Sequence, residues 1–119
     1  MRFLSVLTLS SLLAMPATAS EEITATDGSG WIGHVACANQ DGAPLSQCPY
    51  EALPKENGNV TLRIAMPGGT TRVIYVEGGT PTSSDTTARL GSKRLAQHTV
   101  VLIDPSERFE IPNDVLDPR

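Results

Sequence analysis

The stretch VTLRIAMPGGTTRVIYVE, residues 60–77, decides the fold expected for this chain. Apolar residues at every second position of 60–66 give the period-2 pattern of a strand with one buried face. A proline and two glycines then form a turn, and the β-branched residues of 71–77 predict a second strand. We therefore expect a β-hairpin with Arg63 and Arg72 on its outward faces.

Two further strands are predicted toward the C-terminus. Residues 99–104 are strongly apolar and residues 107–111 alternate again, with an Asp-Pro-Ser turn between the two segments. Pro112 ends the second strand, and residues 113–116 form a short cap. Over the four strands, alternate residues are expected to be largely buried: Val60, Leu62, Ile64, Val73, Tyr75, Val101, Ile103, Phe109 and Ile111.

The other segments have weaker patterns. Residues 31–36 are a short apolar stretch that predicts a first strand, whereas residues 48–53 fit either a helical turn or a short strand. Residues 88–96 are also ambiguous, and we favour a strand there because Gly91 weakens a helix. Residues 82–87 are polar and are predicted to be a connection.

Strands that follow one another through tight turns form an antiparallel meander, and no βαβ unit is visible. We expect a mainly β fold, either a single antiparallel meander sheet or a partly open barrel, with a small α+β fold as the alternative. A disulfide-stapled N-terminal segment is expected to cover one face or end of the sheet.

The first 19 residues have the three parts of a secretory signal. Arg2 precedes an uncharged apolar run, and residues 17–19 supply an A-x-A cleavage site. The apolar run is shorter than the roughly 20 residues needed to cross a bilayer, so we expect no retained anchor. We predict removal of residues 1–19, a flexible leader at residues 20–30 and a single β-rich domain at residues 31–119, in the periplasm or secreted.

The mature chain is acidic, because loss of Arg2 changes the formal net charge from −4 to −5. Nucleic acids and anionic lipids both select a positively charged surface. We therefore expect neither nucleic-acid binding nor stable membrane insertion after removal of the signal. The expected partner is another protein of the cell envelope or a glycan.

Both cysteines, Cys37 and Cys48, lie in the mature chain, and an even number in an exported protein indicates a disulfide. A redox pair usually has the spacing C-x-x-C, and a zinc site needs four ligands at short spacings. His34 lies near Cys37, but no second matched pair exists. We predict a structural disulfide that closes a loop of about 12 residues and contributes about 3 kcal/mol.

Two motifs carry a resemblance to a known group of proteins. Residues 69–74 have the form G-x-x-R-x-I, and residues 107–115 have the form E-R-[YF]-E-I-P-x-x-V. With the paired cysteines, these motifs resemble a group of uncharacterised small exported proteins of alphaproteobacteria. The resemblance covers most of residues 31–116 and implies a bacterial, exported setting. It assigns no activity and no catalytic residue.

No catalytic set can be assembled from the titratable residues. His34 lies beside the predicted disulfide, and His98 begins a strand, where we expect a surface position. Glu107 and Glu110 fall on opposite faces of a strand, so they cannot converge as a general acid and base. We predict no catalytic residue, no cofactor and no metal site.

Three classes of function remain. The first is an exported, non-catalytic binding or inhibitory module of the bacterial cell envelope; the second is an accessory or structural subunit of an envelope complex; the third is a small hydrolase. For binding, Trp31 is either an exposed anchor beside the leader or a plug at one end of the sheet. Arg72, Arg89 and Arg94 are the charges predicted to steer an acidic partner.

Overall fold

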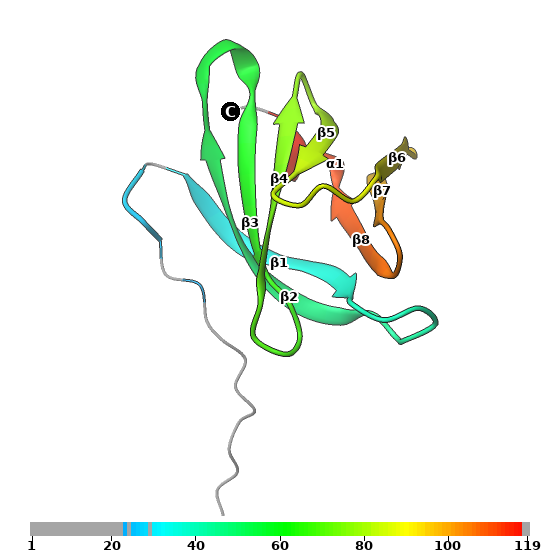
Figure 1. Ribbon diagram of the computed structural model, residues 1–119. Helices are drawn as coiled ribbons and strands as arrows, with labels where there is room; N and C mark the ends of the chain where they lie inside the picture. Colours follow the sequence, from blue (N-terminus) through cyan, green and yellow to red (C-terminus); the bar gives the residue numbers. More distant parts are fainter. Residues whose placement is uncertain (1–22, 24, 29, 118–119) are drawn as a thin grey trace, which may run out of the picture.

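The computed structural model describes residues 23, 25–28 and 30–117, and the predicted signal at 1–19 lies outside this part (Figure 1). Eight strands follow one another along the chain: β1 (Trp31–Ala38), β2 (Ser46–Pro54), β3 (Val60–Ala65), β4 (Thr71–Glu77), β5 (Thr80–Ser84), β6 (Leu90–Arg94), β7 (His98–Ile103) and β8 (Glu107–Pro112). Two short helical elements complete the described chain: the 3₁₀ turn η1 (Glu56–Gly58) and the helix α1 (Asn113–Leu116).

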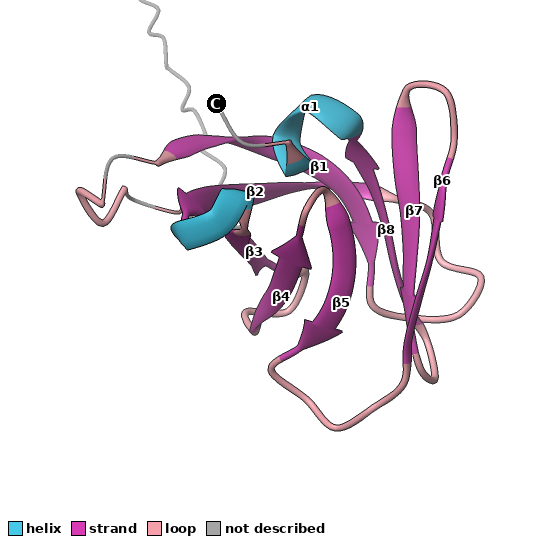
Figure 2. Ribbon diagram, turned by 90° about the horizontal axis from the view of Figure 1, so that it is seen from above, coloured by secondary structure: helices cyan, strands magenta, loops and turns pink. Residues whose placement is uncertain are grey.

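All eight strands belong to one antiparallel sheet in the order β5-β4-β3-β2-β1-β8-β7-β6. The pairing of β1 with β8 joins the two halves of the chain, and the sheet curls into a nearly closed barrel (Figures 1 and 2). Its two edges, β5 and β6, lie next to each other but do not pair within the described residues. We call this junction the seam. The prediction of a mainly β meander or partly open barrel is confirmed.

The core fills the inside of the barrel. Seven of the nine residues predicted to be buried lie there: Val60, Leu62, Ile64, Val101, Ile103, Phe109 and Ile111. At one end of the barrel, α1 contributes the buried Val115 and Leu116, as the predicted cap requires. We call this the α1 end and the opposite end the mouth.

The register predicted for β4 was wrong by one residue. Val73 is only half-buried and Tyr75 is 40 % exposed, whereas Ile74 is fully buried. The β3–β4 hairpin pairs Leu62 with Ile74, and directly opposite residues of a hairpin share a face. Arg72, two residues before Ile74, therefore lies on the inner face, so the prediction that it faces outward was wrong too.

The structure also shows the conformation of three further segments. Residues 88–96 contain the strand β6, as favoured, and residues 48–53 lie within β2 and are strand. The strand β5 was missed, because its sequence Thr-Pro-Thr-Ser-Ser is polar and carries Pro81. Such a sequence suits the edge of a sheet. A proline has no N–H to donate, and on the open side of an edge strand no neighbouring strand requires one.

The predicted disulfide between Cys37 and Cys48 is present, and the two Cα atoms lie 5.9 Å apart. Both cysteines are buried on the inner face, on the adjacent strands β1 and β2. The sulfur of Met66 packs 3.8 Å from that of Cys37. Because the disulfide joins the end of β1 to the start of β2, it fixes both ends of the loop at residues 39–45.

Candidate functional site

Arg72 of β4 lies at the mouth and is held by two carboxylates. Its Nε and Nη2 donate to the carboxylate of Glu107 on β8 at 2.8 and 2.6 Å, and its Nη1 donates to Asp85 at 2.8 Å. The side chains of Arg72 and Glu107 are only 19 % and 17 % exposed. The guanidinium thus links β4, β8 and the start of the β5–β6 connection, and its charge is already compensated.

The pKa values of Arg72 and Asp85 are shifted in the directions that these hydrogen bonds favour. The hydrogen bonds from Arg72 to Glu107 raise the pKa of Arg72, against the opposing effect of burial. Burial acts to raise the pKa of Asp85, but the hydrogen bonds from Arg72 and from the Val73 amide outweigh it, so this pKa lies below its usual value. Folding therefore favours the charged forms of Arg72 and Asp85.

The other two predicted arginines lie elsewhere. Arg89 is 83 % exposed just before β6, with its Nε 3.9 Å from the carboxylate of Asp104. Arg94 ends β6 near the α1 end, where its guanidinium lies 3.5 Å from the carboxylate of Asp117 and from the carbonyl oxygen of Gly79. The structure does not bring these arginines together with Arg72 into one surface.

Trp31 begins β1 on the inner face of the barrel. It is half-buried and packs against the core cluster. This position corresponds to a plug at the α1 end, which was one of its two predicted roles.

A different surface combines an exposed apolar side chain with positive charges. Leu102 is 51 % exposed on the outer face of β7, a strand paired on both sides. It lies opposite Gly91 of β6 and Arg108 of β8, and Val100 is the next outward residue on β7. We define the Leu102 face by six outward residues of β6–β8 and the chain just before β6: Arg89, Gly91, Lys93, Val100, Leu102 and Arg108.

The Leu102 face carries one uncompensated positive charge. Arg108 is paired with Glu110 at 2.6 Å, and Arg89 lies near Asp104. Lys93 is exposed and has no ion-pair partner among residues 23, 25–28 and 30–117. Asp104 and Glu110 offset Arg89 and Arg108 on this side of the sheet, so Lys93 leaves it with one positive charge in excess.

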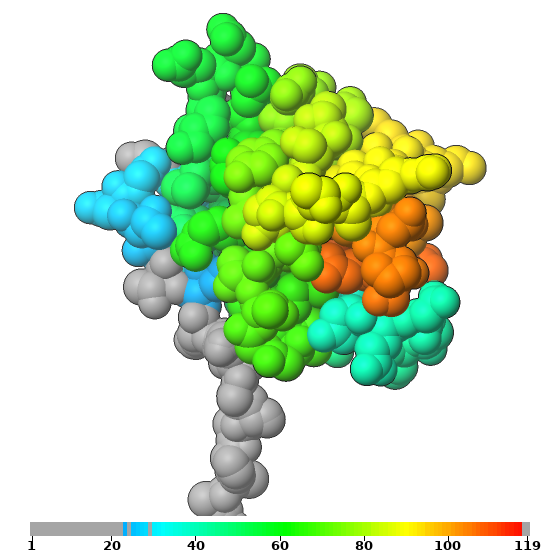
Figure 3. Space-filling view, viewed as in Figure 1, coloured from blue at the N-terminus to red at the C-terminus, as the bar shows by residue number. Residues whose placement is uncertain are grey.

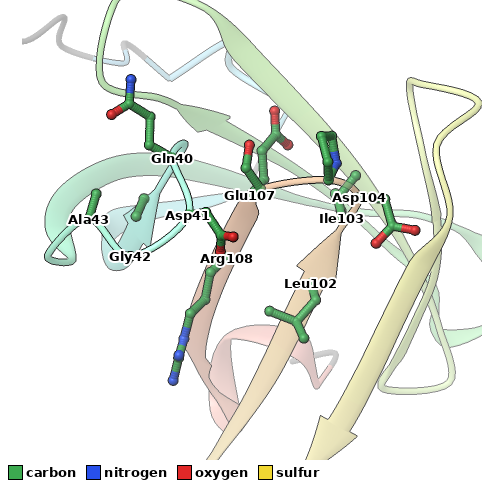
Figure 4. A pocket seen from close by; sticks show the side chains of 12 residues that line it. Gln40, Asp41, Gly42, Ala43, Leu102, Ile103, Asp104, Glu107 and Arg108 are labelled. Carbon is green, nitrogen blue, oxygen red and sulfur yellow. The ribbon is translucent and has the colours of Figure 1, made fainter.

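An open groove of about 510 Å³ borders the Leu102 face. One wall is formed by Ala38 and residues 40–43 of the β1–β2 loop, and the other by residues 102–108 of the β7–β8 hairpin (Figure 4). In the space-filling view, the loop and the hairpin lie side by side at the surface (Figure 3). Residues of both segments line the groove, and Leu102 is an exposed apolar residue among them.

Hydrogen bonds tie one wall of the groove to the β3–β4 turn and the two walls to each other. The side-chain amide of Asn39 donates to the carbonyl oxygen of Pro67 at 2.7 Å, and the hydroxyl of Ser106 donates to the carbonyl oxygen of Asn39 at 3.1 Å. The disulfide fixes the ends of the same loop. The groove is thus a preformed feature whose shape depends on the staple.

One buried charge was missed in the sequence analysis. Glu51 lies on the outer face of β2 but is only 1 % exposed, and Thr26 lies against its carboxylate. Its carboxylate accepts hydrogen bonds from the amide and hydroxyl of Thr26, at 2.8 and 3.0 Å, and from Arg63 at 2.8 Å. Burial acts to raise the pKa of Glu51, and these hydrogen bonds outweigh it, so its pKa lies below the usual value.

Glu107 and Glu110 face opposite sides of β8, as expected from a strand: Glu107 reaches Arg72 at the mouth, and Glu110 pairs with Arg108 outside. In the part of the chain that the structure describes, no three His, Cys, Asp or Glu side chains gather as a group able to hold a metal ion. Nor do the described helices include one long and apolar enough to span a membrane.

No protein family, curated protein sequence or solved structure shows significant similarity to this chain. The resemblance to small exported alphaproteobacterial proteins therefore stays a prediction.

Proposed function

We propose that the mature domain is an exported, non-catalytic binding module of the cell envelope, and that it binds another protein through the Leu102 face and the adjoining groove. One observation carries the proposal. Leu102 is 51 % exposed near the end of β7, a strand paired on both sides, and it lies beside the groove and between Arg108 and the exposed Lys93.

The chemistry of this surface suits a protein segment. Interfaces combine an apolar anchor with a polar rim that fixes orientation. Leu102 supplies the apolar contact, and Arg89, Lys93 and Arg108 surround it. The groove of about 510 Å³ is lined by polar and charged residues such as Gln40, Asp41 and Arg108 as well as by Leu102, and it is offered as the place for a loop of the partner (Figure 4).

Charge defines the expected partner further. Lys93 has no ion-pair partner among the described residues, whereas Arg72 and Arg94, both predicted to steer a partner, are held by carboxylates of the same chain. Steering by this domain therefore depends on Lys93 and Arg89. An acidic partner segment is favoured, and its association rate falls as the salt concentration rises.

The test is a pull-down from the organism's own envelope extract with the mature protein and two variants. Leu102→Asp places a charge at the centre of the face, and Leu95→Asp changes a comparably exposed leucine in the turn between β6 and β7. We expect Leu102→Asp to lose the partner and Leu95→Asp to keep it, with both melting temperatures close to that of the wild type. Retention of every partner by Leu102→Asp, or turnover of an envelope substrate by the wild type, overturns the proposal.

A further inference from the structure

The seam leaves β6 with an unpaired edge. β6 pairs with β7 on one side, and its other side faces β5 without pairing among the described residues. Residues 91–94 of this strand are exposed. An unpaired edge offers backbone N–H and C=O groups to a further strand.

The register shows which groups of β6 are free. The Asp104 amide donates to the Arg89 carbonyl oxygen at 3.0 Å, and the Leu95 amide donates to that of His98 at 2.8 Å. In an antiparallel pair, hydrogen-bonded and non-hydrogen-bonded positions alternate. The odd residues of 89–95 therefore bond to β7, and the even residues direct their N–H and C=O groups toward the seam: Leu90, Ser92 and Arg94.

The opposite edge is less suited to pairing. β5 contains Pro81, which has no N–H, and its register with β4 shifts between Tyr75 and Val76. Prolines and bulges are features that protect edge strands. β6 has neither a proline nor a register shift, and its protection is the charge of Lys93 and Arg94, which an acidic strand would compensate.

We propose that β6 receives an extended segment of the partner protein as an added strand, and that this segment carries acidic side chains at alternate positions. The proposal rests on the proposed function, because the outward residues of β6 belong to the Leu102 face. The strand takes the place beside β6 that β5 now occupies, which requires the two edges of the barrel to separate, and it forms main-chain hydrogen bonds with the even residues of β6. Its outward side chains then lie beside Arg89 and Lys93, which both face outward.

Charge complementarity selects this occupant over a second copy of the chain. If two β6 strands paired with each other, the sequence Leu-Gly-Ser-Lys-Arg would bring Lys93 and Arg94 of both copies to one short interface. β6 contains no acidic residue, so a second copy would offer nothing to compensate these charges. An acidic strand instead compensates Lys93, and its alternating side chains match the two faces of the barrel wall.

The probe is the capped peptide Val-Glu-Val-Glu-Val-Glu-Val, which places all its acids on one face of a strand. Controls are a peptide of the same composition in which the three glutamates are consecutive and a peptide with lysine in place of glutamate. Binding is followed by NMR of the ¹⁵N-labelled mature protein. We expect only the alternating acidic peptide to shift the amides of Leu90, Ser92 and Arg94 and to slow their hydrogen exchange. Equal responses to all three peptides, or none, overturn the proposal.

Two variants test the edge directly. Ser92→Pro removes an N–H that points into the seam, whereas Ser92→Ala keeps it, and we expect only Ser92→Pro to lose peptide and partner at least tenfold. Lys93→Glu is a second variant that leaves the backbone unchanged, with Lys55→Glu as its control at an exposed position before η1. We expect Lys93→Glu alone to weaken binding several-fold.

If Leu102→Asp loses the partner while Ser92→Pro and Lys93→Glu retain it, strand addition is wrong and the proposed function stands. A wild-type dimer in sedimentation experiments that Ser92→Pro converts to a monomer overturns the choice of occupant.

Discussion

Arg72 and Glu107 connect opposite walls of the barrel. Their strands, β4 and β8, are separated in the sheet by β3, β2 and β1, yet the two side chains form a bidentate pair at 2.8 and 2.6 Å across the mouth. Asp85 adds a third charge from the connection that follows β5. The group therefore closes the mouth and holds that connection in place.

Removal of this pair should destabilise the fold. Arg72→Ala leaves Glu107 and Asp85 without their partner in a partly buried site, and we expect a loss of about 1–3 kcal/mol in the free energy of unfolding. Urea unfolding measures it. The control is Arg89→Ala, since Arg89 is 83 % exposed and lies 3.9 Å from its acid, and we expect a change within about 0.5 kcal/mol. Equal losses in the two variants would contradict the structural role of Arg72.

The register of β4 can be tested by a matched pair of truncations. Ile74→Ala removes a fully buried side chain and should cost about 2–5 kcal/mol, while Val73→Ala, at a half-buried outward position, should cost less than about 1 kcal/mol. Chemical denaturation of both variants gives the comparison. A larger loss in Val73→Ala would restore the register expected from the sequence.

Stability should depend on acidic pH through Glu51 and Asp85. Folding lowers both pKa values, so each carboxylate contributes stability above its unfolded-state pKa and loses it as the pH falls through the folded-state value. We expect the free energy of unfolding to decrease from about pH 4.5 downward. Glu51→Gln should show a shallower decrease than the wild type, and Glu56→Gln, at an exposed position in η1, should match the wild type. Parallel curves for all three proteins would show that Glu51 does not contribute.

The disulfide should stabilise the fold by about 2–4 kcal/mol. The double variant Cys37→Ala/Cys48→Ala measures this in denaturant, and alkylation of the denatured, unreduced wild type should label neither cysteine. Because the staple fixes both ends of the 39–45 loop, the double variant should also bind the partner more weakly than the wild type at a temperature where both are folded. Full labelling of both cysteines would show that the bond is not formed.

The export signal is tested by intact mass. Protein from the envelope fraction should lack residues 1–19 and begin at Ser20, as the A-x-A site predicts. A mass corresponding to a chain that begins at Met1 would show that the segment is retained.

Much of the fold follows from local pattern. The strands β3, β7 and β8 were predicted nearly to the residue, because their apolar side chains alternate and clear turns separate them. The register of β4 could not be predicted in the same way. Its residues Val73, Ile74, Tyr75 and Val76 are all compatible with burial, so the inward face is decided by pairing with β3 and by the contact of Arg72 with Glu107.

The candidate site was harder to predict than the fold. Arg72 looks like a free surface charge in the sequence, because its partner Glu107 is 35 residues away and is brought to it only by barrel closure. The Leu102 face was missed for a related reason. Leu102 lies in the run Val-Val-Leu-Ile, and composition alone does not distinguish an outward leucine there from its buried neighbours Val101 and Ile103. Glu51 was missed as well, because its contact with Thr26 joins residues that are 25 positions apart in the sequence.

The position of the seam has a topological consequence. β1 and β8 pair in antiparallel fashion, so the start of β1 and the end of β8 lie at the same end of the barrel. A circular permutant that joins these two points and opens the chain within residues 85–89 would have the strand order β6-β7-β8-β1-β2-β3-β4-β5. Every strand would then pair with its neighbours in sequence, as in an uninterrupted up-and-down meander, and both new termini would lie at the seam.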